Sequence, residues 1–187
     1  MLDKSVPHFD ILMHRKKGEP LVHFPLPEPF KYRLFKEGDE NDWAEIETSV
    51  LEFDSEAEAL DYFQKTFLPF INEIKRRCLF IEAPSGKKIA TTTVWWEYTE
   101  KRRDPWIHWV AVHPDYQGLG LGKAIAAKAI ELMTEIEGER DFYLHTQTWS
   151  HRAVRIYEQL GFEITAEKNL NGFSNDNYEK AVAFRRC

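Results

Sequence analysis

Apolar residues recur with changing periods along this chain, and the changes predict an alternation of strands and helices. Runs typical of strands occupy residues 9–14, 32–35, 79–83, 88–98, 106–112, 142–146 and 162–165. Helical spacing predicts helices over residues 38–53, 55–76, 121–137 and 150–160. A last stretch, residues 178–185, is predicted to form a closing strand. This order of elements predicts an α/β (α+β) fold built on a mixed sheet.

Capping and turn residues mark the boundaries of several elements. Ser55 and Glu58 have the spacing of a capping box at the start of the second helix, and Gly161 is a typical C-cap of the fourth. Three prolines within Pro25–Pro29 predict an extended segment without regular structure. We therefore expect residues 1–30 to form an arm packed on the domain and residues 31–187 to form one domain.

Composition narrows the class of protein. With 43% hydrophobic and 30% charged residues, the chain has the make-up of an ordinary soluble domain. Its formal charge of −6 argues against a nucleic-acid partner, which requires clustered Lys and Arg. Two cysteines, Cys78 and Cys187, give no disulfide framework. Neither a signal peptide nor a run long enough to cross a membrane is recognised, so we expect a cytoplasmic protein without a membrane partner.

A glycine-rich segment between a predicted strand and a predicted helix carries the clearest chemical signal. Gly118, Gly120 and Gly122 alternate just before the helix. Backbone N–H groups there converge on one small concavity at the positive end of the helix dipole, which suits a phosphate or pyrophosphate. A turn that merely needs flexible residues is the simpler alternative.

The two common nucleotide-binding motifs do not fit this segment. In the dinucleotide fingerprint G-x-G-x-x-G, Lys123 would stand at the third glycine. In the P-loop pattern, Gln117 replaces the first glycine and Ala124 replaces the hydroxyl residue that holds magnesium.

The segment Gln117-Gly118-Leu119-Gly120-Leu121-Gly122 resembles instead the acyl-CoA loop of the GNAT family of N-acetyltransferases, Q/R-x-x-G-x-G/A. A second segment, Trp149–Phe162, is similar to the later motif of that family, N-x-x-A-x-x-x-Y-x-x-x-G-F. Ala153, Tyr157 and Gly161 match it, whereas Ser150 stands where the family often carries asparagine. The motifs follow one another in the order of the family.

The resemblance implies a sheet with helices on both faces and a V-shaped splay between the fourth and fifth core strands, residues 106–112 and 142–146. It also implies acetyl transfer from acetyl-CoA to an amine, without a metal. The residues implied to bind the cofactor are Val110, Ala111, Val112, Gln117, Gly118, Leu119, Gly120, Leu121, Gly122, Lys123, Ser150 and Ala153.

Three residues are candidates for proton transfer. Tyr157 stands at the tyrosine position of the family and would protonate the leaving thiolate, although packing on the apolar face of its helix also explains it. His108 matches a strand histidine that removes the amine proton in arylalkylamine-type relatives, and Glu97 is the second candidate base. Many relatives use a chain of water molecules instead.

The identity of the acetyl acceptor is the feature that the sequence determines least. Residues Asp39 to Asp61 include ten acidic side chains and no basic ones. In the GNAT family the connection between the first two helices forms one wall of the acceptor site, so the resemblance implies that Glu52, Asp54 and Glu56 would attract a cationic amine. Ordinary solvated helix faces explain them equally well. The sequence leaves open whether the acceptor is a small amine, an amino-acid derivative or a peptide N-terminus. It also leaves open whether the protein forms a homodimer. Two further alternatives are a non-catalytic acyl-CoA sensor or scaffold and a nucleotide-binding enzyme.

Overall fold

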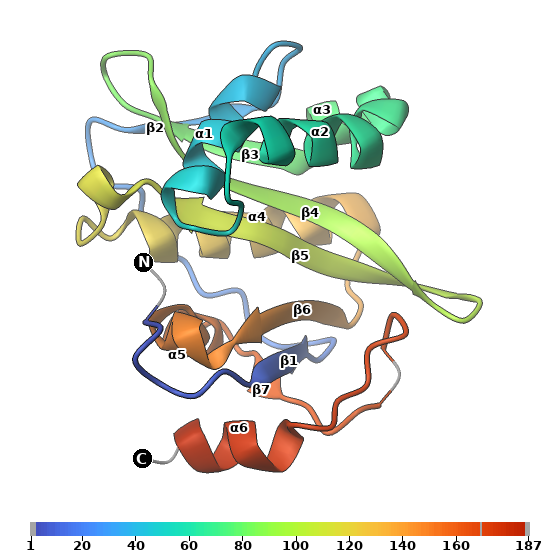
Figure 1. Cartoon of the computed structure of the whole chain (residues 1–187). Coiled ribbons are helices and arrows are strands. Elements are labelled where there is room, and N and C mark those ends of the chain that lie inside the picture. Colours follow the sequence, from blue (N-terminus) through green and yellow to red (C-terminus); the bar gives the residue numbers. More distant parts are fainter. Residues whose placement is uncertain (1–2, 169, 186–187) are drawn as a thin grey trace.

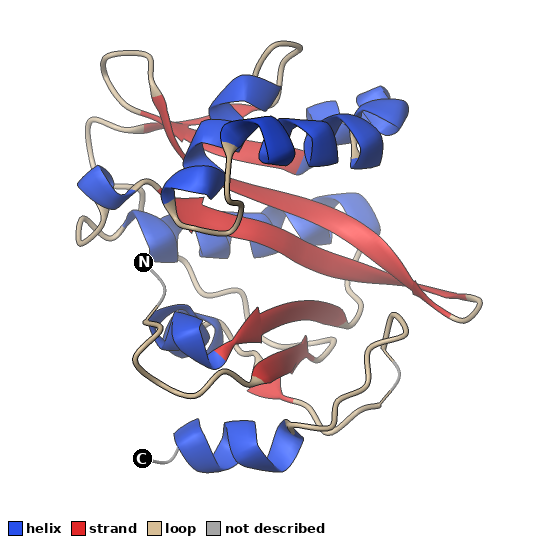
Figure 2. Ribbon diagram, viewed as in Figure 1, coloured by secondary structure: helices blue, strands red, loops and turns tan. Residues whose placement is uncertain are grey.

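The computed structural model describes residues 3–168 and 170–185, which build one seven-stranded sheet flanked by helices (Figures 1 and 2). In chain order the strands are β1 (Asp10–Arg15), β2 (Lys31–Leu34), β3 (Cys78–Glu82), β4 (Lys88–Thr99), β5 (Arg102–Val112), β6 (Phe142–Gln147) and β7 (Glu163–Ile164). The helices are α1 (Glu40–Ser49), α2 (Glu56–Thr66), α3 (Ile71–Arg77), α4 (Leu121–Glu137), α5 (His151–Gln159) and α6 (Tyr178–Arg185). The strands lie in the order β2-β3-β4-β5-β6-β1-β7.

Helices cover both faces of the sheet, as expected. Successive side chains of a strand point to opposite faces, and Val94 and Trp95 of β4 show the division. Val94 belongs to the core beneath α4 and α5, whereas Trp95 belongs to the core beneath α1, α2 and α3. Figure 1 shows α1 and α2 on the near side of the sheet and α4 on the far side.

The sheet opens between β5 and β6, which confirms the predicted splay. Its two parallel pairs here are Trp106↔Tyr143 and Ile107↔Leu144, and the described ladders elsewhere are antiparallel. Beyond Ile107, a bulge in β5 against β4 brings Trp109 to a φ of 55°. The carboxyl-terminal half of β5 therefore leaves β6 and exposes backbone groups that a sheet partner would otherwise satisfy.

The first strand is an inner strand of the sheet. β1 pairs antiparallel with β6 from Asp10↔Gln147 to Arg15↔Phe142, and on its other side with β7. The guanidinium of Arg15 is buried, and its Nε donates to the carbonyl of Leu160 at 2.9 Å. The segment before residue 30 thus supplies part of the half-sheet that carries α5.

The prediction of a closing strand at residues 178–185 is wrong. These residues form α6, which packs on β1 and buries Ala181. The sheet offers no place for another strand beside β6, because β5 and β1 already flank it.

Two predicted helices are shorter than expected, and one strand is longer. The first helix ends at Ser49 rather than residue 53. The second stops at Thr66, because Pro69 introduces a short 3-10 turn before α3 starts. β5 begins at Arg102, four residues before the predicted start, since the β4–β5 hairpin is long. Cys187 lies outside the described residues. Among the residues that are described, no helix is both long and apolar enough to cross a membrane.

Candidate functional site

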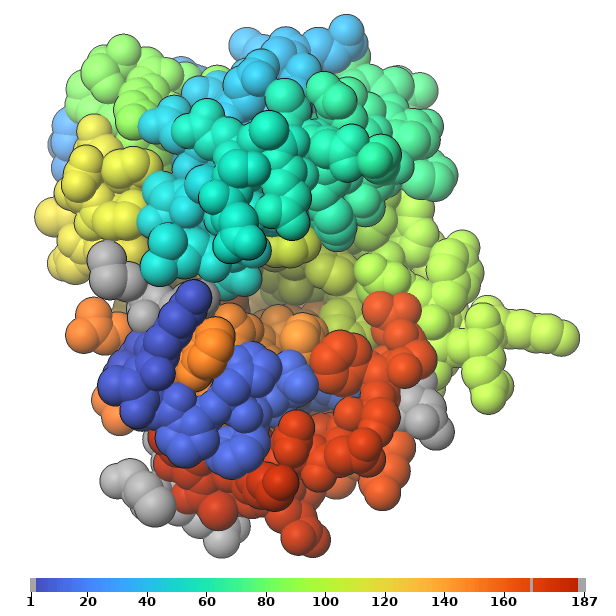
Figure 3. Space-filling model, in the orientation of Figure 1, coloured from blue at the N-terminus to red at the C-terminus, as the bar shows by residue number. Residues whose placement is uncertain are grey.

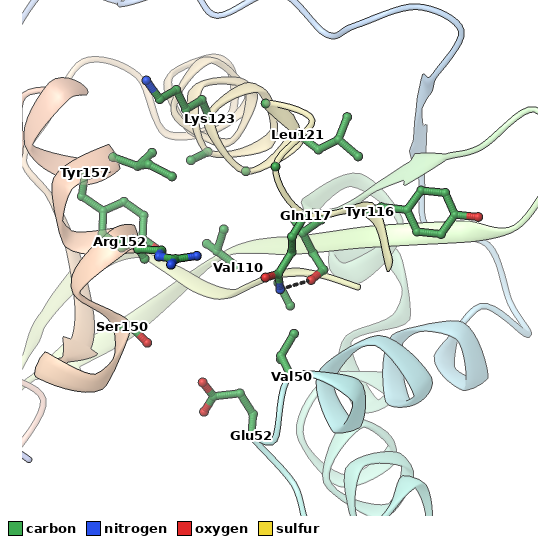
Figure 4. A pocket seen from close by; sticks show the side chains of 18 of the residues that line it. Val50, Glu52, Val110, Tyr116, Gln117, Leu121, Lys123, Ser150, Arg152 and Tyr157 are labelled. Carbon is green, nitrogen blue, oxygen red and sulfur yellow. Dashed lines mark hydrogen bonds between the residues drawn. The ribbon is translucent and has the colours of Figure 1, made fainter. Parts of the chain in front are cut away.

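A cavity of about 450 Å³ lies where β5 leaves β6 (Figure 4). Its walls come from the end of β5, the glycine-rich segment that starts α4, the first turns of α5, and the residues just after α1. The lining residues are Val50, Glu52, Val110, Ala111, Val112, Tyr116, Gln117, Gly118, Gly120, Leu121, Gly122, Lys123, Ala126, Trp149, Ser150, Arg152, Ala153, Ile156 and Tyr157.

The glycine-rich segment has the backbone that an anion site requires. Gly118 and Gly120 have φ values of 82° and 84°, a region that other residues enter at a cost. Gly120 is the N-cap of the 17-residue helix α4 and offers no side-chain cap, so the first N–H groups of α4 are available to a ligand. Together with the helix dipole, these N–H groups make a phosphate site without requiring side-chain charge.

Neighbouring side chains hold and complete this segment. The Nε2 atom of Gln117 donates to the carbonyl of Val112 at 2.9 Å and ties the loop to the end of β5 (Figure 4). Lys123 and Arg152 add positive charge to the lining. The sequence reasoning missed Arg152; its basic side chain in the first turn of α5 was the available signal.

The predicted cofactor residues come together in this cavity with one exception. Leu119 is half-exposed at the tip of the loop and does not belong to the lining. The eleven residues that do line it are Val110, Ala111, Val112, Gln117, Gly118, Gly120, Leu121, Gly122, Lys123, Ser150 and Ala153.

Tyr157 lies deep in the same cavity, on α5. Its side chain both packs in the core with Phe162, at a ring distance of 6.1 Å, and lines the cavity. Burial raises the pKa of Tyr157, and the charges of Glu52 and Glu47 raise it further. The phenol therefore keeps its proton at neutral pH.

The acidic segment after α1 divides into residues that reach the cavity and residues that do not. Glu52 lines the cavity and points into it (Figure 4), whereas Asp54 and Glu56 are exposed and lie outside the lining. Glu47, which the sequence did not single out, is 1% exposed, and its Oε1 has no hydrogen-bond partner. Burial raises the pKa of Glu47 well above its usual value, and the charge of Glu52 adds to the rise.

The two candidate bases contact each other beside the cavity. The Nε2 atom of His108 lies 3.3 Å from Oε1 of Glu97 on the neighbouring strand, and neither residue lines the cavity. A second pair, His145 and Asp10, is 3.2 Å apart. Burial lowers the pKa of His145, and the nearby charge of His108 contributes to the decrease. The structure thus brings the predicted bases together on the face of the sheet that carries Trp106.

A cluster of aromatic side chains lies between this face of the sheet and α1. Trp109 contacts Trp43, Phe53 and Tyr62, with ring centroids 5.6, 5.2 and 5.2 Å away. Figure 3 shows the molecule hollowed between the side chains of α1 and α2 and those of the N-terminal segment and α5. Trp149 lines the cavity, while Trp95 and Trp106 are buried in the core.

Comparison with known proteins identifies the family that the region around this site matches. A family model described as "Acetyltransferase (GNAT) family" matches residues 40–162, about two thirds of the chain. Among the described residues, no group of three or more His, Cys, Asp or Glu side chains is arranged to hold a metal ion.

Curated relatives match shorter stretches. An uncharacterized N-acetyltransferase of Methanocaldococcus jannaschii is 36% identical over 87 residues, which cover 45% of this chain and 38% of that protein. A spermine/spermidine N(1)-acetyltransferase of Bacillus subtilis is 30% identical over 78 residues, covering 41% of this chain and 51% of that protein. The chain therefore spans about half or less of the length of the relatives it matches.

Solved structures share the fold at low identity. A GCN5-related N-acetyltransferase from Sphaerobacter thermophilus superposes with a TM-score of 0.67 at 20% identity, covering 83% of this chain and 48% of that one. A predicted acetyltransferase from Clostridium acetobutylicum, solved with acetyl-CoA, gives a TM-score of 0.56 at 19% identity and covers 74% of this chain and 92% of that one.

Proposed function

Because the chain belongs to the GNAT family of acetyltransferases, we propose that it transfers an acetyl group from acetyl-CoA to a primary amine. One observation supports this proposal above the others: a single cavity contains both the glycine-rich start of α4 and the hydroxyl-bearing Tyr157. An anion site and a proton donor in one cavity are what a thioester carrier with a distant diphosphate requires.

The cofactor would be held mainly by the backbone. The N–H groups from Gly118 to Lys123 bind the diphosphate, with Lys123 and Arg152 adding charge. The apolar side chains of Val110, Val112 and Ala153 enclose the arm that carries the thioester, in the gap where β5 lacks a neighbour. Ser150 contacts the same arm near the start of α5.

With the cofactor placed in this way, the amine attacks the thioester directly. The amine nitrogen bonds to the thioester carbonyl carbon, and backbone N–H groups near Val110 to Val112 stabilise the oxygen as it becomes negative. The C–S bond then breaks, and the thiolate takes a proton from Tyr157. The proton lost by the amine goes through water to His108, whose Nε2 lies 3.3 Å from Oε1 of Glu97.

The class of acceptor is a primary amine of a small molecule or a peptide. Three relatives named as spermidine or spermine N(1)-acetyltransferases support an aliphatic amine, although each matches less than half of this chain.

A thiol-release assay tests the proposal directly. Acetyl-CoA is incubated with the full chain and a panel of amines, amino acids, polyamines and short peptides, and free CoA is measured. We expect release that depends on an amine, and a lower rate in His108→Gln. Stabilisation by acetyl-CoA without release would indicate a CoA-binding sensor or scaffold instead. Stabilisation by ATP or NAD but not by CoA would reject the proposal altogether.

A further inference from the structure

The segment before β1 packs against one wall of the cavity. Trp149 lines the cavity just before the start of α5. Its indole N–H donates to the carbonyl of Val6 at 2.9 Å, and the N–H of Asp3 donates to the carbonyl of Trp149 at 2.8 Å. Figure 3 shows this segment (blue) against the start of α5 (orange), beside the hollow. Residues far away in the sequence therefore support one wall of the cavity.

Lys4 lies between these two anchor points, and its amino group lies against the cavity wall. Its Nζ atom is 5.4 Å from the centre of the Trp149 ring. Its charge also acts on Glu52, another lining residue. Burial raises the pKa of Glu52, whereas a hydrogen bond with Gln147 and the charge of Lys4 lower it. The amino group of Lys4 is thus placed at the cavity by an aromatic ring and by a carboxylate of the lining.

Two further contacts restrain the backbone on either side of Lys4. The Oδ2 atom of Asp3 lies 3.5 Å from Nε2 of His151, in the first turn of α5, and the ring of His8 meets the ring of Trp149 edge-on at 4.6 Å. The side chain of a lysine is a flexible four-carbon stem, so the amino group can leave the indole while the backbone stays in place. A nucleophile held beside its reaction partner reacts without a bimolecular encounter.

We propose that Lys4 is a modification site of this protein: the acetyl group of bound acetyl-CoA passes to the Nζ atom of Lys4 within the same chain. The proposal rests on the proposed function, because it uses the same cavity and the same acetyl donor. Trp149 and Tyr157 line one cavity, so an amino group that leaves the indole enters the space that the proposed general acid faces. Acetylation removes the charge of Lys4 and with it the attraction to the indole and to Glu52.

The transfer follows the same steps as transfer to a free amine. The ammonium group of Lys4 first loses one proton to water, and its nitrogen then bonds to the carbonyl carbon of the thioester. The C–S bond breaks, and the thiolate takes the proton of Tyr157. The excess proton on the nitrogen returns to Tyr157 through water. The products are acetyl-lysine, free CoA and one proton released to solvent.

Mass spectrometry of the full chain tests the modification. The wild type is incubated with isotopically labelled acetyl-CoA and no added amine, and peptide mapping follows the label at each lysine. Lys101, which is exposed in the turn between β4 and β5, is the internal reference for uncatalysed acetylation. We expect label to enter Lys4 about 10²-fold faster than Lys101, within the usual range for general acid–base catalysis. Tyr157→Phe should remove most of this excess.

A mixture of two chains tests whether the transfer stays within one molecule. The wild type is mixed with an excess of Tyr157→Phe, which keeps Lys4 and differs in mass. We expect label on Lys4 of the wild-type chain alone, at a rate that does not depend on protein concentration. Lys4→Arg keeps the positive charge and should carry no label in this segment, whereas Lys101→Arg should label Lys4 normally. Equal rates at Lys4 and Lys101, or label on Lys4 of the Tyr157→Phe chain, would overturn the proposal.

The thiol-release assay keeps this proposal apart from the proposed function. Release of CoA that depends on an added amine, without label on Lys4, would keep the transferase and remove the modification site. If neither Lys4 nor any amine of the panel takes up the acetyl group, the transferase is rejected as well.

Discussion

At the residue scale, the sharpest expectation concerns Tyr157. Its side chain lines the cavity, and burial together with Glu52 and Glu47 raises its pKa, so it holds a proton for the leaving thiolate. Tyr157→Phe keeps the ring that packs with Phe162 but removes the proton donor. We expect kcat to fall by about 10²-fold or more, within the usual range for general acid catalysis, with a small change in KM for acetyl-CoA. Steady-state kinetics and a melting curve separate the two effects, and unchanged turnover would exclude the tyrosine from the reaction.

Single residues also show where sequence reasoning succeeds and where it stops. The glycine-rich loop and Tyr157 could be predicted because their function depends on local spacing, which the sequence displays directly. Glu47 could not, because its burial results from α1, α2 and β5 packing together, and nothing in its neighbours in the chain distinguishes it from the partly exposed Glu45. His108 and Glu97 were identified separately, but their 3.3 Å contact depends on the register of β4 and β5.

At the scale of the elements, a substitution at the start of α4 should affect the stability of the fold and the binding of the cofactor in opposite directions. A Cβ atom added at Gly122 would lie 3.6 Å from Ile156 and 3.9 Å from Val112, which is ordinary contact. Alanine also suits a helix better than glycine by up to about 1 kcal/mol. We therefore expect Gly122→Ala to melt at the same or a higher temperature while binding acetyl-CoA more weakly, because the methyl group enters the cofactor cradle. Thermal unfolding and calorimetry measure both quantities, and unchanged affinity would place the cofactor elsewhere.

The elements that the sequence predicted correctly are those with a strong period of their own, such as α4 and β4. The element predicted wrongly, α6, shows the limit of that reasoning. Its apolar residues are compatible with a strand, but the place for a strand beside β6 is taken by β1, which lies more than 120 residues earlier in the chain. Competition between distant segments for one position is not visible in a local pattern.

At the scale of the whole molecule, a buried charged network joins both helical layers across the sheet. Arg77, at the end of α3, donates to Glu73 at 2.6 Å and to Glu137 of α4 at 2.7 Å, and Arg103 of β5 also donates to Glu137. Burial alone would raise the pKa of Glu137, but hydrogen bonds from Arg103 and Arg77 lower it below its ordinary value of 4.5. The stabilisation is therefore complete above pH 4.5 and is lost as the pH falls through the lower value in the folded protein.

Glu137→Gln should lower the free energy of unfolding by about 3 kcal/mol at neutral pH, because it removes one of the two carboxylates that pair with the buried Arg77 and leaves Glu73 as its remaining charged partner. The difference from the wild type should shrink as the pH falls through the lowered pKa of Glu137, where Glu137 of the wild type takes up a proton. Urea unfolding at a series of pH values measures this difference. Glu135→Gln, an exposed change on the same helix, is the control and should differ little from the wild type at any pH.

The order of the strands indicates that the cooperatively folding unit includes β1. β1 fills the space between β6 and β7, and it buries Ile11, Leu12 and Met13 in the core. Arg15 also binds the carbonyl of Leu160 at the end of α5, the helix that carries Tyr157. A chain that starts at residue 17 would expose the edges of two strands and leave α5 without this support, so we expect it to aggregate or to lose its cooperative melting transition. A synthetic peptide of residues 8–16 should restore both the transition and the binding of acetyl-CoA. If the shortened chain instead melts and binds like the whole chain, the domain starts near residue 31 and the first strand only packs against it.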